Sequence, residues 1–231
     1  MTIAAGAFGV WLAAARAALR GDGGVEVPCG ECVGCCSSGY SVQLRPTDTR
    51  ALAVIPFQWL VDSRAFAPGQ KTLPSRPDGR CRMLESGGCS IYAQRPQTCL
   101  DYDCRVFAAA GIDAGGADKA AINRRVRDWQ FAYPRAEDRQ AHEAVMAAAA
   151  FIRKVGDGSV GIRVPTTPSG IAVLAIKVAE VFLESATPSR SDADTARAVV
   201  AAARAFDTAP QAAGFFAASI TASATLRGTG S

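Results

Sequence analysis

The residues best suited to chemistry in this chain of 231 residues are its eight cysteines, which fall into two blocks. The first block reads C-x2-C-x2-C-C and comprises Cys29, Cys32, Cys35 and Cys36. The second reads C-x7-C-x9-C-x4-C and comprises Cys81, Cys89, Cys99 and Cys104. Thiolates separated by two intervening residues on a tight turn converge on one ion, and soft sulfur ligands select zinc, iron–sulfur clusters or Cu(I). The clustering therefore predicts a metal or iron–sulfur centre.

The adjacent pair Cys35 and Cys36 limits how such a centre is built. Side chains of adjacent residues diverge in extended and in helical backbone, so the two rarely hold one ion together. One of them can ligate while the other serves a second centre, packs or bridges. Eight thiolates can hold two zinc ions, or one four-iron cluster with four cysteines to spare. The arginines beside the cysteines either offset the thiolate charge or lie in solvent; they are Arg80, Arg82, Arg95 and Arg105.

A framework of disulfides is the alternative for an even number of cysteines. The N-terminal stretch from Met1 to Arg20 has no basic residue before its apolar run, so we expect no secretory signal. We therefore expect reduced thiols in a cytoplasmic protein. The run is also short and alanine-rich for a membrane span, so we expect no membrane partner. Its large apolar residues instead predict one side of a packed helix: Ile3, Phe8, Trp11, Leu12 and Leu19.

The chain divides into three predicted segments: an N-terminal apolar helix (1–24), a metal-binding cysteine domain (25–110) and an alanine-rich helical extension with a frayed tail (111–231). We predict a mostly helical α+β fold with a small, irregular, metal-organised domain. In that domain we expect a strand over 41–44, a loop over 67–79 and a helical segment over 99–107. Its predicted buried residues are Leu52, Val54, Ile55, Phe57, Trp59, Leu60 and Val61.

Apolar periodicity predicts the helices of the extension. One face combines Ile122, Val126, Trp129 and Tyr133, and a later one combines Val145, Ala149, Ile152 and Val155. Further helices are expected over 171–183 and 191–206. These apolar faces need covering, and we expect the N-terminal helix to cover them, with a partner protein as the alternative.

Other candidates for chemistry are weaker. The single histidine, His142, shares a helix stripe with Val145 and is expected to pack. Asp101, Asp103 and the basic run containing Arg125 are expected to be solvated. A net charge of +4 is too mild to imply nucleic acid, and we expect none as a partner. No nucleotide-binding or nucleophile motif occurs, so no residue is assigned a catalytic role.

The combined cysteine pattern resembles the YkgJ-like cysteine-cluster family, described as a zinc- or iron-chelating domain. The resemblance rests on the first block and on the string C-x-I-Y-x-x-R-P-x-x-C, present in full from Cys89 to Cys99. It covers roughly residues 25–110 and implies metal chelation. Within the string, Pro96 is expected to fix the turn that delivers Cys99, Arg95 to donate to a thiolate or carbonyl, and Tyr92 to cover the site. Ordinary packing is the alternative for these residues.

Three functions remain open at this point. A non-catalytic protein that binds zinc or iron is favoured. An iron–sulfur redox enzyme or enzyme component is the alternative, and a similar cysteine cluster in some flagellin lysine methylases suggests a link to methyl transfer by analogy. A thiol redox protein is the third, although C-x2-C is minimal evidence for it.

Overall fold

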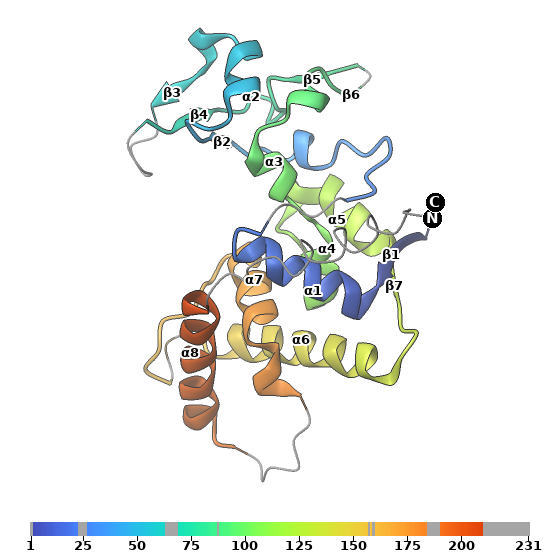
Figure 1. Cartoon of the computed structure of the whole chain (residues 1–231), viewed down its shortest axis with the longest axis vertical. Coiled ribbons are helices and arrows are strands. Elements are labelled where there is room, and N and C mark those ends of the chain that lie inside the picture. The colour runs from blue at the N-terminus through green and yellow to red at the C-terminus, as the bar shows by residue number, and fades with distance from the viewer. Residues whose placement is uncertain are drawn as a thin grey trace, which may run out of the picture.

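The computed structural model describes residues 2–22, 27–62, 69–86, 88–156, 158, 160–183 and 190–209. Within them the chain is mostly helical with three small sheets, which confirms the predicted α+β class. Figure 1 shows short strands and short helices at one end of the molecule and the longer helices at the other. No helix among the described residues is long and apolar enough to cross a membrane. The predicted frayed tail lies outside the described residues.

The N-terminal segment is a strand followed by a helix, β1 (Ile3–Ala7) and α1 (Phe8–Leu19). The prediction of a helix from the first residues is wrong for Ile3–Ala7, which pairs in parallel with β7 (Trp129–Ala132). Gly6 has φ +94°, a left-handed conformation that no helix accommodates, and the strand register shifts between Ala4 and Gly6. Phe8 and Trp11 are buried as expected, whereas Leu19 is exposed.

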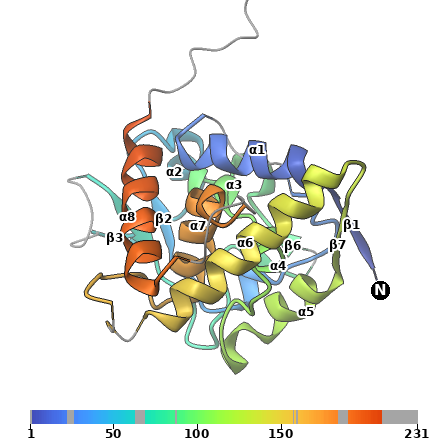
Figure 2. The same ribbon diagram turned by 90° about the horizontal axis from the view of Figure 1, so that it is seen from below.

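The helices of the extension pack on this segment. They are α5 (Ala120–Asp128), α6 (Ala136–Lys154), α7 (Pro168–Val178) and α8 (Asp192–Thr208), and α4 (Arg105–Ala110), which precedes the extension, shares their core. One core joins Phe8 and Trp11 to Phe107, Val145 and Ile176, which confirms that the extension covers the N-terminal helix. Figure 2 shows α1 lying across α6 with α7 beside them. We call these elements, with β1 and β7, the helical body.

The predicted apolar face that ran through Trp129 to Tyr133 does not belong to one helix. Helix α5 ends at Asp128, and Trp129 begins β7. Ile122, Val126 and Trp129 are nevertheless all buried in the same core. Pairing with β1 explains the change, because an extended Trp129 satisfies its backbone groups across the strands instead of along a helix.

The other end of the molecule, residues 27–101, is here called the cysteine layer. It contains a sheet of order β2 (Val42–Leu44), β4 (Lys71–Leu73) and β3 (Val61–Asp62), and the hairpin β5 (Leu84–Glu85) and β6 (Gly88–Cys89). Its helices are α2 (Thr49–Val54) and α3 (Gln97–Asp101), with short 3-10 turns at Cys35–Ser37, Phe57–Trp59 and Tyr92–Gln94. A small separate core holds it together: Leu44, Ala51, Ile55, Leu73, Met83 and Ile91.

The strand over 42–44 was predicted, but three features of this layer were not. The predicted loop over 67–79 contains β4, which pairs with both β2 and β3. Phe57 is 76% exposed and Val61 49%, so their assignment to the core was wrong. Val54 is also exposed, because the short helix α2 turns Ala51 and Ile55 inward instead. Three-stranded sheets this short bury only a few side chains, so several apolar residues remain outside.

Candidate metal centre

The two cysteine blocks lie against each other. The backbone N–H of Cys81 donates to the carbonyl of Cys36 at 2.6 Å, and that of Gly39 donates to the carbonyl of Gly79 at 2.7 Å. These bonds join the end of the first block to the start of the second. The backbones of the two blocks are therefore adjacent.

A compact turn presents the cysteines of the first block. Cys32 N–H donates to the carbonyl of Cys29 at 3.0 Å, with Gly30 in the left-handed conformation at φ +55° that lets the chain reverse. The N–H of Gly34 points at the Cys32 sulfur at 3.4 Å. Ser38, which is buried, closes the turn by donating from its hydroxyl to the carbonyl of Gly34 at 2.6 Å. The turn thus directs polar groups inward around the thiols.

A hairpin and a helix start carry the second block. Cys89 lies opposite Leu84 in the hairpin of β5 and β6. Pro96 stands at the N-cap of α3, and the N–H of Cys99 donates to its carbonyl at 2.9 Å. The side chain of Asp48 accepts from the N–H of Gln97 at 2.8 Å, which fixes this helix start. The predicted helical segment over 99–107 is broken after Asp101, and α4 begins only at Arg105, so Cys104 sits in the bend between two helices.

All eight cysteines are free thiols. Seven are half-buried and Cys104 is buried. Burial is the main cause that raises the pKa of Cys29 and Cys89, and it raises the pKa of Cys99 to about 12 and that of Cys104 to about 12. Interaction between the adjacent thiols of Cys35 and Cys36 lowers the pKa of Cys35 and raises that of Cys36.

The thiols form two neighbourhoods that meet at Cys35. Near the helical body, Cys104 lies in the large core, and the charges of Cys29 and Cys32 raise its pKa. In the cysteine layer, Cys81 and Cys89 pack on the small core, and both interact electrostatically with Cys36 and Cys99. Cys35 interacts with members of both neighbourhoods, namely Cys29 on one side and Cys89 and Cys99 on the other.

Among the described residues, no three side chains of His, Cys, Asp or Glu are arranged so that they could hold one ion as they stand. The chemistry of the donors nevertheless fits a thiophilic ion, because every candidate ligand is a cysteine sulfur and none is tied up in a disulfide. Closing a tetrahedral set would require sulfurs to rotate toward one another within their neighbourhoods.

Arg95 is a cation whose charge acts on several of the thiols. Its charge favours ionisation of Cys29, Cys35 and Cys99, although burial and neighbouring thiols outweigh it at Cys29 and Cys99. Its guanidinium stacks on the ring of Tyr92 at 3.6 Å, and its buried Nε has no hydrogen-bond partner. Tyr92 itself is 55% exposed and lies on the outer side of this stack.

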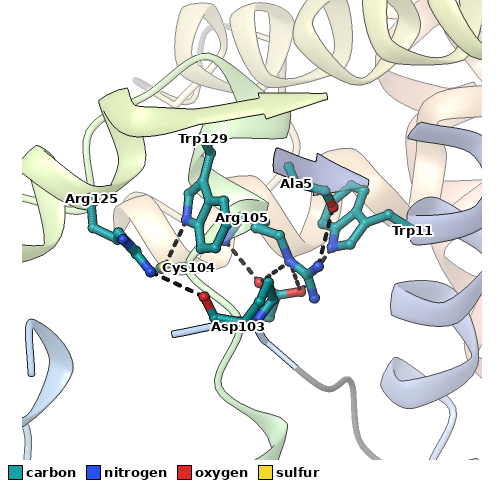
Figure 3. Close-up of polar contacts among 8 residues, drawn as sticks. Ala5, Trp11, Asp103, Cys104, Arg105, Arg125 and Trp129 are labelled. Carbon is teal, nitrogen blue, oxygen red and sulfur yellow. Dashed lines mark hydrogen bonds and ion pairs between the residues drawn. The ribbon is translucent and has the colours of Figure 1, made fainter. Parts of the chain in front are cut away.

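A buried polar network beside Cys104 was not predicted. Asp103, expected in solvent, is buried and accepts from Trp11 Nε1 at 2.8 Å and from Arg105 Nε at 2.9 Å. Arg105 also donates to the carbonyl of Ala5 at 3.2 Å, so it holds β1 rather than a thiolate (Figure 3). Asp101, in contrast, is bound at the surface by Gln97 and Arg45, as its predicted solvated position requires.

The helical body contributes two more contacts that sequence analysis missed. Trp129 Nε1 donates to the Cys104 sulfur at 3.2 Å (Figure 3). Arg125, expected on a solvated face, donates to the carbonyl of Cys29 at 2.7 Å and to that of Pro28 at 3.1 Å. The exposed neighbour Arg127 pairs instead with Asp113, as a solvated residue would. Only the spacing of Arg125 and Trp129, four residues apart, hinted that they share a face.

His142 packs away from the cysteines, as predicted. Its ring stacks on Phe8 with centroids 4.3 Å apart, and its Nδ1 lies 2.6 Å from the hydroxyl of Tyr133. Burial lowers the pKa of His142, and the nearby carbonyls of Ala108 and Ala109 oppose that shift only in part. The neutral histidine is thus part of the core of the helical body.

Comparison with known proteins agrees with this geometry. Residues 28–121 match the family model CxxCxxCC, described as a "putative zinc- or iron-chelating domain". No curated protein matches the chain, and no solved structure matches it. The matched segment contains all eight cysteines and ends inside α5, before Arg125 and Trp129. Residues 28–121 of this chain are therefore similar to a family whose domain is described as putatively zinc- or iron-chelating.

Proposed function

We propose that this protein binds zinc or iron through the thiolates of its cysteine cluster. The observation that supports the proposal is the backbone contact of the two cysteine blocks, which come from distant parts of the chain and together carry eight free thiols. Soft sulfur donors in such density suit zinc, and they also suit an iron–sulfur cluster.

The neighbourhoods suggest how the ligands divide. One set would comprise Cys29, Cys32, Cys35 and Cys104 at the boundary with the helical body. The other would comprise Cys36, Cys81, Cys89 and Cys99 in the cysteine layer. This division places the adjacent Cys35 and Cys36 in different sets, which relieves the divergence of neighbouring side chains. The Cys36 carbonyl bond to Cys81 and the packing of Cys81 and Cys89 on one small core support the second set.

The site favours a non-catalytic, organising role. When bound, the metal would supply folding free energy, or electron transfer if it were an iron–sulfur cluster. Among the described residues of the cysteine layer, the small core has six buried apolar side chains, which is little for a layer of this length. Within that layer Arg95 would offset thiolate charge, while Pro96 holds the helix start that carries Cys99. Tyr92 would restrain the Arg95 guanidinium by stacking.

Elemental analysis of anaerobically purified protein tests the proposal. Wild-type protein should retain zinc or iron in stoichiometric amount after removal of loosely bound ions. Cys99→Ser should lower the metal content, and the double variant Cys32→Ser with Cys99→Ser should lower it further if two sets exist. A surface variant such as Val10→Ala should retain the wild-type content, because Val10 is 71% exposed on α1. Wild-type protein that contains no metal and whose eight thiols all react with a thiol reagent would contradict the proposal.

A further inference from the structure

Two cysteines accept hydrogen bonds from residues outside the segment that matches the family. Trp129 Nε1 donates to the sulfur of Cys104, and Arg125 donates to the carbonyl of Cys29. Both donors lie beyond residue 121, where the matched segment ends. Their targets come from different cysteine blocks but from the same neighbourhood, since the charge of Cys29 acts on Cys104. The junction of α5 and β7 therefore spans the boundary at which the two blocks meet the helical body (Figure 3).

The fold holds these donors firmly. Trp129 is 6% exposed, and its backbone is paired with Ile3 of β1. Its ring lies between two guanidinium groups, with Arg125 4.7 Å and Arg105 5.9 Å from the ring centre. Arg105 is itself fixed by the buried carboxylate of Asp103. The indole is thus pre-positioned, and little rotational freedom remains for it to lose when Cys104 becomes a ligand.

In the hydrogen bond between Trp129 and Cys104, the donor and the acceptor are fixed by chemistry. An indole N–H is a donor only, so the Cys104 sulfur must accept. A thiolate accepts more strongly than a thiol, and hydrogen bonds to ligand atoms orient them and tune their bond to the metal. Arg125 acts on the backbone instead, where it fixes the turn that presents Cys29 and Cys32. Both contacts act on ligands without touching the ion.

We infer that Trp129 and Arg125 are positioning residues for the metal centre, and that the helical extension completes a site which the family segment alone holds less well. The inference rests on the proposed function. Trp129 sets the direction of the Cys104 sulfur, and Arg125 sets the distance of the Cys29 turn from it. Loss of either contact should speed release of the metal without removing a ligand.

Metal release to a chromophoric chelator measures this directly in the full-length protein. Trp129→Phe keeps the aromatic packing and deletes the N–H, and Arg125→Leu keeps the aliphatic stem. Each should raise the release rate about tenfold or more, in line with the effect of outer contacts on metal affinity. The matched controls are Trp59→Phe, whose ring faces Arg82 in the cysteine layer, and Arg127→Leu, which loses only the surface pair with Asp113. Both controls should stay within about twofold of wild type.

The contact itself can be tested without metal and without changing Trp129. Hydrogen exchange of the Trp129 indole N–H, followed by NMR in metal-free protein, should be slow in wild type. It should become faster in Cys104→Ala and recover in Cys104→Ser, which restores an acceptor. Fast exchange already in wild type, or no change in Cys104→Ala, would overturn the contact.

The outcomes separate this inference from the proposed function. If wild type binds metal and Trp129→Phe and Arg125→Leu release it at the wild-type rate, the inference falls and the proposed function stands. If wild type binds neither zinc nor iron, both fall, whatever the exchange of the indole N–H. If Trp129→Phe fails to fold, Arg125→Leu and the two Cys104 variants still decide the matter.

Discussion

The indole N–H of Trp11 in α1 donates to the buried carboxylate of Asp103 at 2.8 Å, across 92 residues of sequence. Asp103 directly precedes Cys104, and the same carboxylate is bound by Arg105, whose guanidinium reaches the carbonyl of Ala5. The N-terminal segment is therefore locked to the bend that carries Cys104 by charge-assisted hydrogen bonds inside the large core.

Removal of the Asp103 charge should be costly. Asp103→Asn keeps the shape but leaves the 6% exposed Arg105 without that counter-charge, so we expect the free energy of unfolding to fall by about 3–5 kcal/mol. Chemical denaturation measures it. Asp101→Asn, at the surface two residues earlier, should change stability by less than about 0.5 kcal/mol. Equal effects of the two variants would mean that the buried network contributes nothing specific.

Helix α7, which lies far along the extension from Arg125 and Trp129, is expected to be structural. Ile176 is fully buried between α7 and its neighbours, so Ile176→Ala should cost about 2–5 kcal/mol of stability. The metal content of the folded fraction should be that of wild type. A variant that keeps its stability but loses metal would show that α7 serves the centre directly.

His142 should make stability depend on pH. Its pKa in the folded state is lowered, chiefly by burial, so below the ordinary value of about 6.5 the unfolded chain binds more protons than the folded one. The stability that neutral His142 provides is thus present above that pH and is lost as pH falls below it. The charged groups near it are Arg139 and Glu143 on its own helix.

The difference in unfolding free energy between wild type and His142→Gln isolates this effect, because titrations common to both proteins cancel. We expect that difference to move in favour of the variant between pH 7.5 and pH 5.5. A difference that stays constant over this range would show that His142 titrates alike in the folded and unfolded states.

Removal of metal should loosen the cysteine layer before the helical body. The sequence predicted a metal-organised domain over residues 25–110, and the region expected to unfold is smaller than this, because Cys104 and α4 share the large core. Anaerobic chelation followed by limited proteolysis should give first cuts between Val42 and Arg95, with α6 and α7 left intact. If the cysteine layer resists proteolysis without metal, its small apolar core is sufficient to keep it folded.

Local features of the fold were predictable from the sequence, and long-range ones were not. The β2 strand and the helices α6 to α8 follow from the periodicity of apolar residues and from turn residues. The burial of Asp103 does not, since its partner Trp11 is 92 residues away. Trp129 was assigned to a helix because it lies three residues after Val126, which is a helical spacing. The same spacing arises here because α5 is followed directly by β7 and both residues face one core.

In the candidate site, too, the local features were predictable from the sequence and the long-range contacts were not. Cysteine spacing indicated the donors and the string from Cys89 to Cys99 indicated the family. Arg125 gave no such sign, because a basic run on a helix is usually solvated and only tertiary packing decides which arginine turns inward. The contacts from the extension to Cys29 and Cys104 therefore needed the structure.

X-ray absorption at the metal edge of the purified protein tests the central claim most directly. We expect a coordination shell dominated by sulfur, with metal–sulfur distances of about 2.3 Å, as for zinc held by cysteine thiolates. Sulfur should be lost from that shell in Cys36→Ser and also in Cys89→Ser, since thiols of both blocks are proposed as ligands. A shell of oxygen and nitrogen only, unchanged in both variants, would contradict the account.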